Sequence, residues 1–222
     1  LSLSVGARKE DNKVTLQIEN LYRGKTGFDY RTNIEYTVAA DGSILVNSTI
    51  IPSTKGVIIP RIGYRMELPE GFERMRWYGR GPLENYVDRK DATYVGVYDE
   101  LVSDQWVNYV RAQEMGNRED LRWISITNPD GIGFVFIAGD KMSASALHAT
   151  AQDMVDSANH RRLLHKYEVP MRKETVLCLD ANQRPLGNAS CGPGPMQKYE
   201  LRSQPTVFSF IILPLERSYS TE

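Results

Sequence analysis

The chain has 222 residues, with 27 lysines and arginines against 28 aspartates and glutamates, so its formal net charge is -1. This length can bury a full core as one domain, residues 1–222, and the charge balance gives no reason to expect nucleic acid or an acidic membrane surface as partner. Cys178 and Cys191 are too few for a disulfide scaffold and lack the partners of a zinc site.

Apolar and polar residues alternate through much of the first fifty positions, most clearly in residues 14–18 and 34–38. This period of two predicts half-buried antiparallel strands. Asp41-Gly42 then predicts a hairpin turn, because these residues readily adopt the positive φ angles that a tight turn needs. The chain therefore begins with a run of antiparallel β-strands.

Further strands are predicted along the rest of the chain, at residues 63–68, 74–78, 122–127, 133–137, 143–147, 175–179 and 207–212. One short helix is expected after Thr150, where Asp153 can complete a capping pair and Met154, Val155 and Ala158 follow at helical spacing. Many strands and almost no helix predict an all-β fold, a sandwich of large antiparallel sheets.

A dense run of aromatic, glycine, proline and charged residues extends from Trp77 to Arg89. Two glycines flank Arg80 and Pro82 fixes a backbone angle, while the charged and amide side chains can tie a long turn to its surroundings. The run predicts an ordered loop. The acidic residues in this run and just after it, Glu84, Asp88 and Asp91, lie beside arginines and a lysine, which favours a structural network over a catalytic acid and base pair.

The run from Trp77 to Arg89 resembles the Trp-x-Gly-x-Gly-Pro-x-Glu-Asn-Tyr-x-Asp-Arg signature of the C-terminal domain of glycoside hydrolase family 2 β-galactosidases. Three more segments resemble the family in the same order, residues 60–63, 114–118 and 160–165, and the match extends from about residue 1 to residue 214. The resemblance implies the galactose-mutarotase-like supersandwich, in which two broad antiparallel sheets stack face to face.

By this resemblance the chain is an N-terminally truncated C-terminal domain of a larger enzyme that hydrolyses terminal β-linked galactose. A retaining glycosidase needs two carboxyl groups roughly 5 Å apart, and in the family they belong to an upstream barrel, with magnesium beside them. We expect no catalytic residue, metal or cofactor in this chain. Its expected partners are the upstream domains, the β-galactoside substrate bound with them, and further copies in a homo-oligomer. The sequence gives no compartment.

The resemblance also indicates where this domain would border the substrate. The family has a tryptophan in Thr-Trp-Leu-x-Ile-Asp, and here Val176 takes its place, which removes a flat stacking face. Asn117 and Arg118 would form either a hydrogen-bonded loop or a wall of the substrate cleft. Trp106, in a polar connection, is expected to be the most exposed tryptophan, and His165 completes the set of candidate substrate-binding residues.

Two alternatives come from other functional classes. The sandwich could hold carbohydrate independently of the barrel, with Trp106 stacking on a sugar. It could instead be an aldose 1-epimerase, a mutarotase that opens a sugar ring by proton transfer with a histidine and a carboxylate, with His160 or His165 in that role. The matched segments favour the β-galactosidase domain over both.

Overall fold

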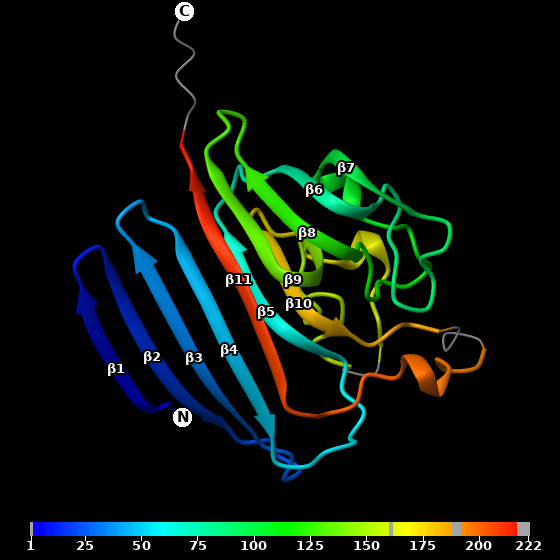
Figure 1. The fold of residues 1–222 in the computed structure, drawn as a ribbon. Helices are drawn as coiled ribbons and strands as arrows, with labels where there is room; N and C mark the ends of the chain where they lie inside the picture. The colour runs from blue at the N-terminus through cyan, green and yellow to red at the C-terminus, as the bar shows by residue number, and fades with distance from the viewer. Residues whose placement is uncertain (1, 160–161, 188–191, 217–222) are drawn as a thin grey trace, which may run out of the picture.

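The computed structural model describes residues 2–159, 162–187 and 192–216 (Figure 1). Its strands are β1 (Ser2–Glu10), β2 (Lys13–Tyr22), β3 (Tyr30–Ala39), β4 (Ile44–Pro52), β5 (Arg61–Leu68), β6 (Arg74–Gly81), β7 (Tyr94–Leu101), β8 (Arg118–Thr127), β9 (Gly133–Leu147), β10 (Thr175–Gln183) and β11 (Thr206–Leu215). Three single-turn 3-10 helices, Val102–Gln105, Lys166–Glu168 and Gln197–Tyr199, complete the described elements. The predicted all-β class is confirmed.

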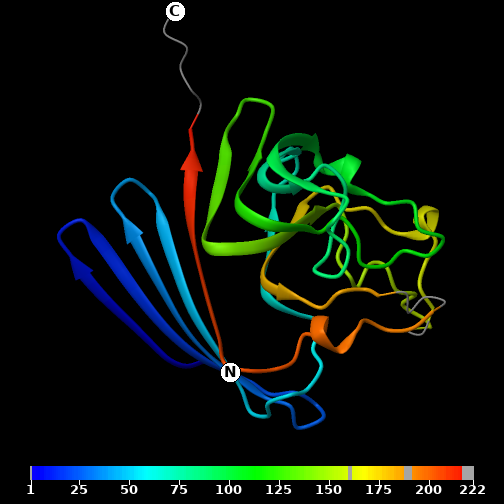
Figure 2. The ribbon, with the colours of Figure 1, turned by 45° about the vertical axis from the view of Figure 1, so that its right-hand side comes forward.

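All paired strands are antiparallel and form one branched sheet in the order β1-β2-β3-β4-β11-β9-β8-β6-β7, with β10 joining β9 to β5. The branch point is the long strand β9. Its first half pairs with β11 from Gly133 to Ala138, and its second half pairs with β10 from Ser143 to Leu147. In Figure 2 the strands β1 to β4 and β11 fan away from the part that contains β5 to β10.

The two parts of the sheet stack on each other, as a sandwich requires. Strands β5 and β11 do not pair, yet the Tyr64 ring on β5 lies 5.4 Å from the Phe210 ring on β11, centroid to centroid. The main core fills this space, and its largest fully buried side chains include Trp77, Phe136, Phe210, Met75, Leu177 and Leu179. The predicted sandwich is therefore present, with its layers joined through β9.

The prediction of a helix after Thr150 is wrong, although the expected capping pair of Thr150 and Asp153 forms. The backbone N–H and hydroxyl of Thr150 donate to Asp153 Oδ2 at 2.7 and 2.8 Å. The chain then turns instead of continuing, because the carbonyl of Met154 accepts from the N–H of Leu164, across the loop. The apolar spacing instead serves a second small core, in which Met154 packs.

Strand boundaries differ from the predicted ones in three ways. Strands β1 and β7, at the two ends of the main strand order, were not predicted. The two segments predicted at 133–137 and 143–147 are one continuous strand, β9. The signature run begins inside β6, so the loop that it predicts starts only after Gly81. Among the described residues, no helix is long and apolar enough to cross a bilayer.

Trp77 gives a direct test of the core. Its side chain is fully buried, stacks on Tyr98 and donates from Nε1 to the carbonyl of Arg80 at 3.0 Å. We expect Trp77→Ala to lower the free energy of unfolding by about 3–5 kcal/mol. Tyr94→Ala, at a side chain that is 76% exposed on β7, should change it by less than about 0.5 kcal/mol. Urea denaturation measures both, and similar losses would contradict this core.

Candidate functional site

The loop after β6 is held to the segment before β8 by a pair of asparagines. Asn85 and Asn117 are both 0% exposed. The N–H of Asn85 donates to the carbonyl of Asn117, and Asn117 Nδ2 donates to the carbonyl of Asn85, both at 2.8 Å. Asn85 Oδ1 also accepts from the N–H of Glu119 at 2.8 Å. We name this arrangement the asparagine clamp, since it fixes two motif segments to each other.

Charged side chains reinforce the clamp. Glu84 accepts from the N–H of Gly116 at 2.8 Å and contacts Arg89 and the hydroxyl of Tyr109. Arg80 donates to Asp120 Oδ2 at 2.6 Å and to the carbonyl of Thr93 at 2.9 Å. Asp88 Oδ2 accepts from the N–H of Gly187 at 3.2 Å. Glu84 and Asp88 thus take part in the structural network that the sequence favours, and Asp91 is exposed.

A second polar centre, which sequence reasoning did not identify, joins β5, β10 and the loop before β8. Arg61 makes two hydrogen bonds to Asp180, from Nε to Oδ1 at 3.1 Å and from Nη2 to Oδ2 at 2.6 Å. Arg61 Nη1 also lies 3.5 Å from Glu114 Oε2. The Asp180 side chain is only 2% exposed, whereas those of Arg61 and Glu114 are 28% and 27% exposed. We name these three residues the Arg61 cluster.

Gly63 makes room for this cluster. A Cβ atom there would lie 2.2 Å from the Leu179 carbonyl oxygen and 2.3 Å from Asp180 Oδ1, far inside van der Waals contact. Only glycine therefore lets β5 and β10 pair while the Asp180 carboxylate reaches Arg61. The family segment at residues 60–63 thus supplies both the cation of the cluster and the space for its anion.

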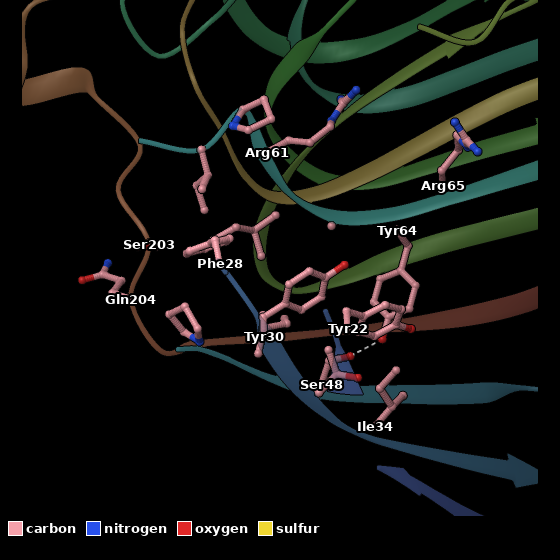
Figure 3. Close-up of a pocket in the computed structure, with 17 residues that line it drawn as sticks. Tyr22, Phe28, Tyr30, Ile34, Ser48, Arg61, Tyr64, Arg65, Ser203 and Gln204 are labelled. Atoms are coloured by element: carbon pink, nitrogen blue, oxygen red, sulfur yellow. Dashed lines mark hydrogen bonds between the residues drawn. The ribbon is translucent and has the colours of Figure 1, made fainter. Parts of the chain in front are cut away.

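The Arg61 cluster lies in the wall of a cleft of about 960 Å³. The cleft wall also includes Val176, Cys178, Arg65, Gln152, Tyr22 and Tyr30. A smaller pocket of about 410 Å³ adjoins the cleft, because the two share the lining residues Arg61, Tyr64, Arg65, Tyr22 and Tyr30. Figure 3 shows this pocket, with Arg61, Tyr64 and Arg65 carried by β5 across from Tyr30.

Ionisation in the cleft follows from burial and pairing. Burial raises the pKa of Asp180 to about 6, with Arg61 acting in the opposite direction. Burial also lowers the pKa of Arg61, but Asp180 and Glu114 raise it more, so the net shift is upward. Glu114 and Asp180 are the carboxyl groups among the described residues that line the cleft, and both are held by Arg61. This pairing suits a shaped wall better than an acid and nucleophile pair.

Asn117 and Arg118 have their side chains in the interior, and neither lines the cleft. Asn117 belongs to the asparagine clamp. Arg118 stacks over the Trp77 ring at 5.0 Å and donates to Gln105 Oε1 at 2.6 Å. Of the two readings of this segment, the geometry favours the hydrogen-bonded loop, and a contact of either side chain with substrate stays a prediction. Val176 does line the cleft, although it is only 3% exposed.

Trp106 is not the exposed ring that its polar neighbours predict. It is half-buried against the second core, and its Nε1 is buried without a hydrogen-bond partner. This packing leaves only part of the ring accessible for stacking on a sugar, and a contact of Trp106 with substrate stays a prediction. The polar neighbours are misleading because Met115 and Leu164 reach this segment from elsewhere in the chain.

The described histidines are held by other protein groups outside the cleft. His165 Nδ1 lies 2.7 Å from the carbonyl of Val110, and its ring stacks on Tyr167. His148 lies 2.6 Å from Glu73 Oε2. Neither lines the cleft, so a substrate contact of His165 stays a prediction, and His160 lies outside the described residues. No group of three or more His, Cys, Asp or Glu residues in the described chain is placed to hold a metal ion.

The ion pair in the Arg61 cluster should be expensive to break from one side. In Asp180→Asn the Arg61 guanidinium loses its closest counter-charge in a mostly buried setting, and we expect the free energy of unfolding to fall by about 2–5 kcal/mol. Glu70→Gln is the matched control, because its pair with Lys173 at 3.3 Å is exposed, and it should cost less than about 1 kcal/mol. Equal losses in chemical denaturation would contradict a buried role for Asp180.

The carboxyl group of Glu119, next to the asparagine clamp, should make the stability of the fold depend on pH. Burial raises its pKa to about 7 from an ordinary value of 4.5, so the folded state holds this proton more tightly than the unfolded state. The contribution of Glu119 to stability should therefore fall as pH rises from about 4.5 to 7. Glu119→Gln should become more favourable relative to wild type by about 1–3 kcal/mol between pH 4.5 and pH 8. An unchanged difference in denaturation at the two pH values would contradict it.

Comparison with known proteins gives a consistent result. The model of the family described as "Beta galactosidase small chain" matches residues 2–212. The chain is 39% identical to a β-galactosidase of Priestia megaterium over 46% of its length, and 31% identical to the β-galactosidase BgaC of Bifidobacterium adolescentis over 83% of its length. It spans 10% and 18% of those two relatives.

Among solved structures, an aldose 1-epimerase candidate from Escherichia coli K12 aligns with 95% of this chain and 68% of its own, at a TM-score of 0.43 and 9% identity. The two β-galactosidase relatives have a much higher sequence identity to this chain than the epimerase has. The matched family region includes the asparagine clamp, the Arg61 cluster and the signature loop. The chain belongs to the β-galactosidase small chain family.

Proposed function

We propose that this chain works as one domain of a larger β-galactosidase, where it forms a wall of the active site. The observation that carries the proposal is the convergence of family segments on one cleft: residues 60–63 and 114–118 and the strand with Val176 and Asp180 meet at the Arg61 cluster. A cleft whose carboxyl groups are both tied to one arginine suits substrate enclosure, with bond cleavage assigned to carboxylates of the larger protein.

The remaining features of the whole enzyme belong to the same proposal. The substrate is a terminal β-linked galactoside, and the partners are the other domains of the enzyme together with further copies in a homo-oligomer. Magnesium, where the enzyme uses it, is assigned to the domain with the catalytic carboxylates. In this proposal the chain only orders and encloses the substrate. That role can still be large, because displacing a reacting group by about 1 Å can lower the rate about a hundredfold.

The mutarotase alternative receives no support from the cleft. Ring opening by proton transfer needs a histidine or a comparable base within hydrogen-bond reach of the sugar. The described residues that line the cleft include no histidine, and His148 and His165 are bonded elsewhere. The alternative of independent carbohydrate binding through Trp106 is less favoured, because this ring is half-buried against the second core.

The proposal predicts how activity divides between the chain and its parent. The longer polypeptide should cleave a nitrophenyl β-galactoside, and the 222-residue chain alone should not. A parent that lacks this chain should lose activity by roughly a hundredfold or more, and adding the chain in trans should restore part of it. Initial rates for the four samples test this. Cleavage by the chain alone, or full activity without it, would contradict the proposal.

A further inference from the structure

We propose that the stacked pair Tyr22 and Tyr30 forms a platform for a neutral sugar ring in the wall of the cleft. This inference deepens the proposed function, because it names a saccharide-binding subsite on the wall that the chain would contribute. It places the aromatic contact on β2 and β3, in a part of the chain far from Val176.

The geometry of the two rings carries the inference. Tyr22 and Tyr30 are opposite each other in the register of β2 and β3, and their rings stack with centroids 4.7 Å apart and an interplanar angle of 13°. They are 42% and 37% exposed, and both line the cleft and the adjoining pocket. A rigid, flat, half-exposed aromatic surface inside a concavity is the feature that stacks on the apolar face of a pyranose ring.

Polar side chains line the same hollows as this platform. Arg65, the neighbour of Tyr64 on β5, lines the cleft with Gln152, and its Nη1 donates to Gln152 Oε1 at 3.0 Å, which leaves other N–H groups of both exposed side chains available. Thr32 also lines the pocket, but it is only 6% exposed and its hydroxyl is enclosed by protein. Arg65 and Gln152 therefore offer hydrogen-bond donors for sugar hydroxyls in the same cleft as the ring pair.

The charge balance selects a neutral ligand. Among the described residues that line the two hollows, four belong to the types lysine, arginine, aspartate and glutamate. They are two arginines, Arg61 and Arg65, and two acids, Glu114 and Asp180. Arg61 is already neutralised by its two acidic partners. Arg65 keeps its charge, but the formal charges of the four groups sum to zero, so the wall as a whole offers a phosphorylated or carboxylated sugar no net positive charge, and uncharged hydroxyls suit it.

Titration of the 222-residue chain with lactose, followed by two-dimensional NMR, tests the inference. Saturable shifts are expected at Tyr22, Tyr30 and Arg65, with a dissociation constant in the millimolar range. Tyr22→Ala and Tyr30→Ala should each weaken binding at least tenfold, and Arg65→Ala severalfold. Tyr94→Ala removes an exposed tyrosine at the opposite edge of the sheet and should leave binding unchanged. Galactose 6-phosphate should bind no more tightly than galactose.

The variant spectra themselves report whether each variant is folded, and Arg65→Ala tests the subsite without touching the ring pair. Absence of saturable lactose shifts, unchanged affinity in the folded tyrosine and arginine variants, or a clear preference for the phosphorylated sugar would each overturn the inference. The result is separable from the proposed function. Hydrolysis by the parent without lactose binding here removes only the subsite, whereas lactose binding by the chain with an inactive parent removes only the role in hydrolysis.

Discussion

The paired contact between Arg61 and Asp180 is the constraint on which the cleft depends. It joins β5 to β10 through two side-chain hydrogen bonds, and it requires Gly63 because no Cβ atom fits beside the Asp180 carboxylate. Burying one charge without the other is costly, so neither residue can be lost alone without disturbing the wall. Glu114 extends the pair to the loop before β8, which the asparagine clamp in turn fixes to the signature loop.

This chain of contacts explains why sequence segments far apart are needed together. Residues 60–63 supply Arg61 and the space at Gly63, the strand after Thr175 supplies Asp180, and residues 114–118 supply Glu114 and Asn117. The signature loop adds Asn85 and Glu84, which bind the backbone of residues 116–119. The four segments form a single polar framework at one side of the sandwich, and the cleft lies against it. In the proposed function, this framework gives the enclosing wall its fixed shape.

Most of the fold could be predicted from period-two alternation and turn residues, and the exceptions have physical causes. Strand β1 has exposed residues on both faces over most of its length, and β7 carries several exposed apolar side chains, so an inside-outside pattern is weak in these edge strands. The capping pair of Thr150 and Asp153 is the same in a helix and in an isolated turn. What decides between them is the cross-loop hydrogen bond from Leu164, which local sequence does not reveal.

The site was less predictable than the fold. Arg61 and Asp180 are 119 positions apart, and a single sequence contains no signal that pairs them. The pairing of Tyr22 with Tyr30 could have been predicted from the sequence, since the register of a hairpin between residues 22 and 30 places them opposite each other. Trp106 is less exposed than its polar neighbours in sequence predict, because apolar residues from elsewhere in the chain pack against it.

The most direct test of the central claim is a structure of the complete enzyme with a bound galactoside, determined by cryo-electron microscopy. The account predicts that the cleft of the Arg61 cluster opens toward the bound sugar and the catalytic carboxylates of another domain. A cleft that faces away from the bound sugar, or catalytic carboxylates that belong to this chain, would contradict it.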